Sequence, residues 1–121
     1  KKISDRRISN ANYLDNGLKN IPEISIPPRP AGFRLVYHLY IVFAENRDGL
    51  MQYCIDQGIE VKIHYPVPIY RQPALEYLVH EEGDYPVTEA HTAKVITFPC
   101  DQHLEQSQLD YIIETVTNYY A

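Results

Sequence analysis

Apolar residues recur at two different spacings along the chain, and the spacing separates predicted helices from predicted strands. Steps of three and four residues predict a helix with a narrow apolar stripe from about residue 2 to Asn20, and a second helix over 47–57. A third, strongly amphipathic helix is expected from Glu105 onward. Asn46 is the expected cap of the second helix, and Gly58 is its expected left-handed stop.

Three stretches have the composition or the alternation of β-strands. Residues 34–43 are rich in aromatic and β-branched side chains and are apolar on both faces, which predicts a central, covered strand. Residues 59–63 alternate apolar and polar positions, which is typical of a strand with one dry face. Residues 94–98 are predicted to form a third short strand that ends at Pro99.

Prolines mark the connections between these elements. Residues 21–32 hold four of the nine prolines, which excludes a helix or a central strand there and predicts an extended connector. Pro66, Pro68 and Pro73 stiffen a loop, the proline loop, directly after the second strand. Pro73 and Pro86 each suit the first position of a short helix.

The element order α-β-α-β-α-α-β-α predicts an α/β fold, a two-layer sandwich in which a small sheet of about three strands packs against helices. A chain of 121 residues can bury one core and is too short for two, so 1–121 is expected to be a single domain. The pattern leaves open whether the sheet is antiparallel or mixed.

Composition narrows the classes of function. The formal net charge is −5 and the basic residues are scattered, so no nucleic-acid surface is expected. The longest apolar stretch, 35–44, is far shorter than the ~20 residues of a membrane helix, so no membrane partner is expected. Cys54 and Cys100 fit two reduced, buried thiols in a cytoplasmic protein. The charged start without a methionine indicates a piece of a longer polypeptide.

The polar residues near the proline loop are the candidate chemistry. Alternation alone makes His64 an exposed strand residue, but Tyr65 follows it at the start of the loop, so an imidazole and a phenol are offered together to a hydroxylated ligand. His38, in the middle of the first strand, is interpreted as a buried histidine with a backbone or water partner. Lys62 lies on the wet face, without the burial that a Schiff-base lysine needs. No spacing of His, Cys and carboxylates is typical of a metal site, so no metal is assigned.

Several short motifs together resemble a known family. In chain order they are Arg6-Arg7, Val36-Tyr37-His38-Leu39-Tyr40, Gly58-Ile59-Glu60, Ile63-His64-Tyr65-Pro66-Val67-Pro68, Gln72-Pro73-Ala74, Pro86, Glu89 and Phe98-Pro99. This series resembles the C-terminal part of the DegT/DnrJ/StrS family of pyridoxal-phosphate (PLP) nucleotide-sugar aminotransferases. The resemblance covers nearly the whole chain.

The resemblance implies the small C-terminal domain of the aspartate-aminotransferase fold, which closes over the active site of a homodimeric enzyme of polysaccharide or natural-product biosynthesis. It implies amino transfer, commonly from glutamate, to a nucleotide-linked keto-sugar, and the His-Tyr-Pro-x-Pro form is similar to members that act on 3-keto sugars. It further implies that His64 and Tyr65 border the sugar, with Gln72 and His38 as additional substrate contacts.

Departures from the family pattern set the remaining expectations. The Schiff-base lysine and the groups that hold PLP belong to the family's large domain, so this chain alone is expected neither to bind PLP tightly nor to turn over. Tyr70 stands where relatives often have histidine. Glu105 replaces the usual Ser or Thr cap before Gln108, and this replacement is expected to weaken the last helix by ~1 kcal/mol.

Two alternative functions stay open. One is a PLP-dependent sugar dehydratase of the same family, and the other is a free-standing α/β module whose proline loop binds a protein partner.

Overall fold

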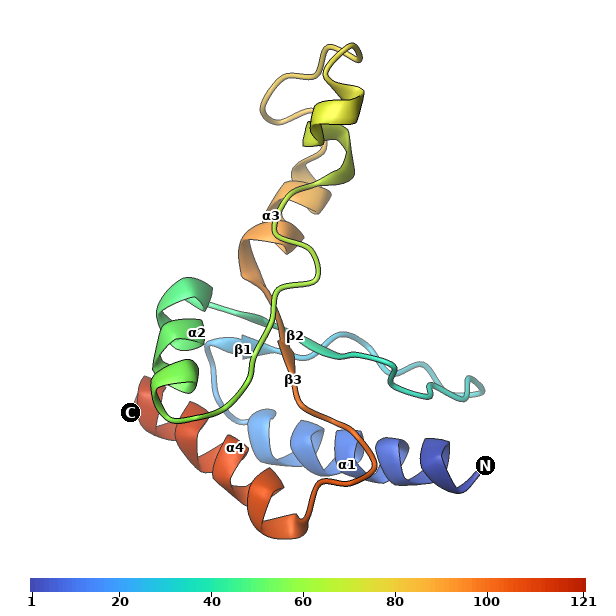
Figure 1. The fold of residues 1–121 in the computed structure, drawn as a ribbon, viewed down its shortest axis with the longest axis vertical. Helices are drawn as coiled ribbons and strands as arrows, with labels where there is room; N and C mark the ends of the chain where they lie inside the picture. The colour runs from blue at the N-terminus through green and yellow to red at the C-terminus, as the bar shows by residue number, and fades with distance from the viewer.

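Two long helices form the base of the computed structural model, which describes residues 1–121. α1 (Lys2–Leu18) and α4 (Gln106–Tyr120) lie side by side beneath a small sheet, and α2 (Arg47–Asp56) packs against α4 and the sheet (Figure 1). These are the three helices that the apolar spacing predicts, with ends shifted by one or two residues. Gly58, at φ +81°, ends the α2 region in the left-handed conformation as predicted.

The sheet is antiparallel, with the strand order β1-β2-β3 and β2 in the centre. The strands are β1 (Ile24–Ser25), β2 (Tyr40–Ala44) and β3 (Val95–Phe98). Tyr40 pairs with Phe98 at one end of the β2–β3 ladder, and Phe43 pairs with Val95 at the other. The predicted two-layer α/β sandwich is therefore confirmed. The 21–32 connector is extended as expected, and it contributes β1 as an edge strand between its prolines.

The core lies between the sheet and the helices and consists of one cluster of 18 buried residues. Along β2 the buried side chains of Tyr40, Val42 and Ala44 alternate with half-buried ones, as the two-residue period of a strand requires. Leu14 of α1 and Leu50 of α2 are fully buried in the same cluster. Because one cluster joins the helices and the sheet, these elements form a single packed unit.

The strand predicted over 34–43 is wrong in its first part, since β2 begins only at Tyr40 and residues 34–39 are irregular. β3 ends at Phe98, and Pro99 has no N–H with which to continue the ladder. Arg7 takes the place of a partner strand: its Nε donates to the carbonyl oxygen of Tyr37 and its Nη2 to that of His38, each at 2.7 Å.

The strand predicted over 59–63 is also wrong, although its burial pattern is right. Ile59 and Val61 are buried as the alternation requires. Only Lys62 pairs, and its N–H and C=O exchange hydrogen bonds with Thr97 at 3.1 and 2.8 Å. In this register Glu60 lies opposite Pro99, which has no N–H, so the ladder does not extend toward Ile59.

Asn46 is the N-cap residue of α2 as predicted, but its side chain makes no capping hydrogen bond. Its backbone is left-handed, with φ 46°, and its Nδ2 donates to the hydroxyl of Tyr119 at 2.6 Å. The side chain thus joins α2 to the end of α4 instead of binding the α2 N-terminus. A positive φ at this position is compatible with Asn, which tolerates that region better than most residues.

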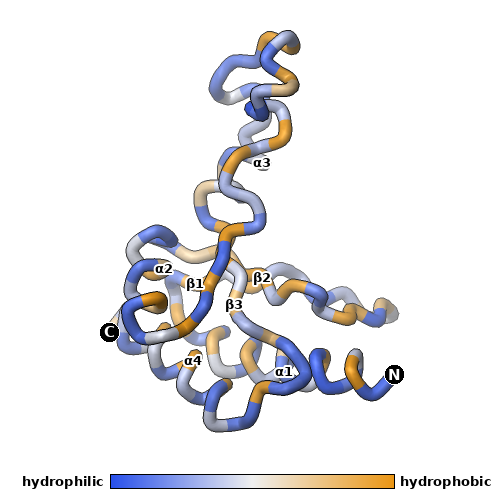
Figure 2. The backbone as a smooth tube through the Cα atoms, viewed as in Figure 1, coloured by the Kyte–Doolittle hydropathy of each residue, from blue (hydrophilic) through white to orange (hydrophobic).

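One long segment projects from the rest of the molecule. We call residues 64–94 the arm and the remaining residues the body. The arm contains the single turns η1 (Ile69–Arg71) and η2 (Pro73–Leu75) and the helix α3 (Pro86–Lys94). Figures 1 and 2 show it as a narrow extension with apolar and polar residues mixed along its length. The helix predicted at Pro86 is confirmed, whereas the one predicted at Pro73 is a single 3₁₀ turn.

Candidate functional site

Two surface hollows flank the base of the arm and contain the four substrate-binding residues that the sequence suggests. The first has a volume of about 290 Å³ and contains both His38 and His64. The second has a volume of about 520 Å³, lies along the proline loop and contains Tyr65 and Gln72. His64 and Tyr65 are consecutive residues, so neighbouring positions line the two hollows where the arm leaves the body.

His64 is fixed by the edge of the sheet. Its Nδ1 lies 2.9 Å from Oγ1 of Thr97, a buried residue of β3, and this contact leaves Nε2 for a ligand. The ring of Tyr65 meets the imidazole edge-on, with centroids 5.5 Å apart, and the peptide bond between the two residues is cis. The His64 side chain is half-buried and the Tyr65 side chain is exposed. The imidazole is therefore held in place and the phenol is accessible.

His38 is exposed, so its interpretation as a buried strand histidine is wrong. It lies on the irregular segment ahead of β2, and its carbonyl oxygen is bound by Arg7. With no partner strand beside it, the imidazole lines the first hollow instead of packing into the core. Arg7, part of the Arg6-Arg7 motif, also lines this hollow, although the sequence alone assigns it no role.

Charges in the first hollow are balanced. Two basic residues, Arg7 and Lys62, and two acidic residues, Glu60 and Asp101, line it. Nζ of Lys62 lies 2.7 Å from Oε1 of Glu60, and this hydrogen bond holds the pKa of the Glu60 carboxyl below its usual range. A hollow with two imidazoles and no net charge suits a hydroxylated ligand better than a highly charged one.

The proline loop closes on itself at the second hollow. Nε2 of Gln72 donates to the carbonyl oxygen of Val67 at 3.3 Å, which brings the end of the loop back over its prolines. Tyr65, Pro66, Pro68 and Gln72 together line the second hollow, which is more apolar than the first. One side-chain N–H of Gln72 is therefore used within the loop. The side-chain carbonyl oxygen and the second amide hydrogen remain for a ligand.

Comparison with known proteins decides the family. The sequence profile of the DegT/DnrJ/EryC1/StrS aminotransferase family matches residues 1–117. The chain belongs to this family. It is 32% identical over 92% of its length to the erythromycin biosynthesis sensory transduction protein EryC1 of Saccharopolyspora erythraea. It is 34% identical over 90% of its length to the dTDP-3-amino-3,4,6-trideoxy-alpha-D-glucose transaminase of Streptomyces venezuelae.

Solved structures of the family agree with the fold. The crystal structure of DesV from S. venezuelae, in complex with a ketimine intermediate, matches 98% of this chain with a TM-score of 0.92 and 31% identity. A DegT/DnrJ/EryC1/StrS aminotransferase from Brucella abortus matches 98% of the chain with a TM-score of 0.89 and 27% identity. The chain spans about 30% of the length of its curated relatives and 32% of the DesV chain.

Aminotransferases of this family in general use PLP, and the lysines of this chain do not fit that cofactor. A lysine that forms an imine needs a dry environment that lowers its pKa. Lys62 is the one lysine that lines either hollow, and it is 61% exposed and paired with Glu60. Lys94 pairs with Glu45 at the surface, and the other three lysines are exposed.

Neither a metal site nor a membrane span is found. No group of three or more His, Cys, Asp or Glu side chains could hold a metal ion. No helix combines the length and the apolar character needed to cross a bilayer.

Proposed function

We propose that residues 1–121 act as the C-terminal small domain of a PLP-dependent aminotransferase that converts a nucleotide-linked keto-sugar into an amino sugar, with glutamate as the amino donor and a homodimer as the working unit. The family membership supports the reaction class. One observation carries the assignment of this part of the enzyme: the first hollow brings His38 and His64 together at the base of the arm.

In this proposal the chain binds and orients the sugar. Thr97 holds Nδ1 of His64, so Nε2 is directed to a sugar hydroxyl. Tyr65 and Gln72 offer a phenol and an amide to the remaining polar groups of the sugar, and the stiff proline loop limits the entropy lost on binding. PLP supplies the amino-group carrier when it is bound, and it would be held by residues outside this chain.

The natural polypeptide that contains residues 1–121 tests the proposal directly. Its mass is expected to be about three times 14.1 kDa, because the chain spans 30% of its curated relatives. A natural mass near 14.1 kDa would favour the free-standing interaction module.

The product of the natural-length enzyme separates the two reactions of the family. A sugar that has lost water instead of gaining an amino group would support the dehydratase.

The variant His64→Ala separates sugar binding from cofactor binding. Loss of a held hydrogen-bonding group is expected to slow the sugar half-reaction about 10- to 100-fold while PLP uptake stays unchanged. His103→Ala is the matched control, because His103 is exposed and lines neither hollow. Sugar kinetics that are equal in the two variants would remove His64 from the site.

A further inference from the structure

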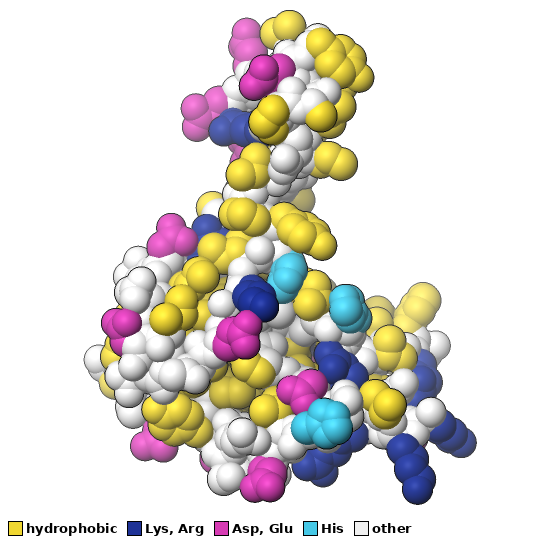
Figure 3. Space-filling view, in the orientation of Figure 1, with side chains coloured by type: hydrophobic (Ala, Val, Ile, Leu, Met, Phe, Trp, Pro, Cys, Tyr) yellow, Lys and Arg dark blue, Asp and Glu magenta, His cyan; other side chains and the backbone are white.

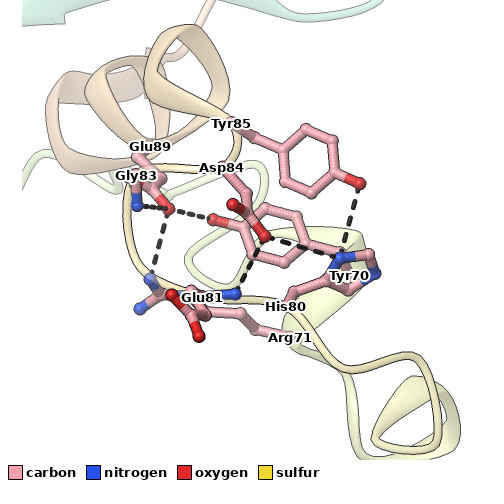
Figure 4. A network of polar contacts seen from close by, with 8 residues as sticks. All are labelled: Tyr70, Arg71, His80, Glu81, Gly83, Asp84, Tyr85 and Glu89. Carbon is pink, nitrogen blue, oxygen red and sulfur yellow. Dashed lines mark hydrogen bonds and ion pairs between the residues drawn. The ribbon is translucent and has the colours of Figure 1, made fainter.

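The arm is held in shape by a small cluster around Tyr70. Tyr70 is the only buried residue of the arm, with 9% of its surface exposed. Its ring packs against the rings of Tyr85 and His80, with centroids 4.6 and 5.5 Å away (Figure 4). Burial and the hydrogen bond to Glu89 raise the pKa of Tyr70, so its hydroxyl stays a donor. The arm therefore has a fixed interior of its own, though a very small one.

The Glu89 carboxylate joins three segments of the arm at this cluster. Its Oε1 accepts a hydrogen bond from the Tyr70 hydroxyl at 2.6 Å and one from Nη2 of Arg71 at 3.2 Å, both from η1. Its two oxygens accept from the N–H of Gly83 at 3.2 and 3.1 Å, in the turn before α3 (Figure 4). The hydrogen bonds from Tyr70 and Gly83 lower the pKa of Glu89, which favours the charged, fully accepting form.

The first part of the proline loop thus lies between two attachments to the same returning segment. At the base, His64 contacts Thr97 of β3, and at the outer end Tyr70 contacts Glu89 of α3. α3 runs directly into β3 at Val95, so the two attachment points belong to one continuous helix–strand unit. Residues 65–69 are the span between the attachments.

We propose that Glu89 is a positioning residue for the substrate site: by holding Tyr70 and Arg71 it fixes the proline loop, and with it Tyr65 and Gln72, in the orientation that receives the sugar. This inference rests on the proposed function for its substrate. Glu89 itself lines neither hollow, so it acts through the loop.

Hydrogen exchange on the natural-length protein tests the hold on the loop without any activity. The N–H groups of Arg71 and Gln72 donate to the carbonyl oxygens of Pro68 and Ile69, at 3.0 and 3.1 Å, and report on the order of η1. Glu89→Ala is expected to speed their exchange at least about tenfold. Glu89→Gln keeps one acceptor oxygen and the length of the side chain, so it is expected to speed exchange less. Tyr70→Phe removes a single donor from the carboxylate and should act in the same direction.

The control for exchange is Glu82→Ala, which removes an exposed carboxylate from the neighbouring turn. Exchange in Glu89→Ala that matches the Glu82→Ala control would overturn the proposal. Tyr70→Phe keeps the packed ring, so it decides the question even where Glu89→Ala fails to fold.

Kinetics separate a positioning role from a structural one. Glu89→Ala is expected to raise KM for the nucleotide-linked sugar about tenfold and to leave the glutamate half-reaction within twofold, with partial recovery in Glu89→Gln. Equal losses in both half-reactions would contradict positioning. A wild-type protein without transamination would contradict the proposed function alone, because the exchange experiment still decides whether Glu89 holds the loop.

Discussion

The body and the arm are stabilised in different ways. The body buries a contiguous cluster of 18 residues, so the hydrophobic effect dominates there. The arm buries only Tyr70 and relies on stiff prolines and one carboxylate. It also exposes large apolar side chains, among them Val79 at 88%, and Figure 3 shows apolar atoms along the arm above its narrow junction with the body. Apolar burial thus fixes the fold, while a polar cluster gives the arm its shape.

The largest expected difference between the regions comes from one substitution made in each. Leu14→Ala removes a fully buried side chain from the body core and should lower the free energy of unfolding by about 2–5 kcal/mol. Leu78→Ala removes the same atoms from the arm, where the side chain is 43% exposed, and should cost less than about 1 kcal/mol. Urea unfolding of both variants measures the two values. Equal losses would show that the arm folds as part of the body core.

Arg47 tests the junction between the two regions. Its side chain is buried, and its Nη1 donates to the carbonyl oxygens of Val95 at 2.9 Å and Thr92 at 3.2 Å, where α3 turns into β3. Arg47→Met keeps most of the volume and removes both of these hydrogen bonds, together with the 2.6 Å ion pair from Nε to the exposed Asp48, so we expect a loss of about 2–3 kcal/mol in urea unfolding. Arg34→Met is the control, since Arg34 forms an exposed ion pair with Asp5 that should contribute under about 1 kcal/mol. An Arg47 variant as stable as the control would contradict a structural role for the junction.

The parts of the fold that follow from local spacing were predictable from the sequence. α1, α2 and α4 are present because their apolar stripes depend only on residues three and four positions apart. The strands over 34–43 and 59–63 are overestimated because a ladder depends on its partner, and Pro99 directly after β3 has no N–H with which to continue the pairing with either segment. Sequence alternation reports which side chains are buried and does not report the partner's length.

Helix ends and site contacts were harder to predict for related reasons. Glu105 was expected to weaken α4, yet its side chain accepts from the backbone of the third helical residue, and its own N–H donates to Gln108 at 2.9 Å. A carboxylate thus fills the role of the usual hydroxyl. The neighbours of His64 in sequence suggest it as a site residue, but its partner Thr97 is 33 residues away. Contacts at that distance depend on the topology, which the sequence pattern left open.

Alkaline pH provides the most selective test, because both thiols belong to the body. Burial raises the pKa of Cys54 and of Cys100 to about 11. An unfolded thiol ionises at about 8.5, so the folded state binds these protons more tightly. The resulting stabilisation is complete below about pH 8.5 and is lost as the pH rises toward 11.

Between about pH 8.5 and 10 the free energy of unfolding should fall by up to ~1.4 kcal/mol per pH unit for each thiol, as urea unfolding at stepped pH would measure. The double variant Cys54→Ala and Cys100→Ala should be less stable at neutral pH, and its free energy of unfolding should no longer fall with pH in this range. If the free energy of unfolding of the double variant still falls with pH, groups other than the thiols cause the loss of stability.

The arm should not respond over the same pH range. Tyrosine ionises only near about pH 10, so Tyr70 should still hold the arm, and the exchange protection of the Arg71 and Gln72 N–H groups should stay constant. If the exchange protection of Arg71 and Gln72 falls over the same pH range, the small cluster of the arm depends on the stability of the body.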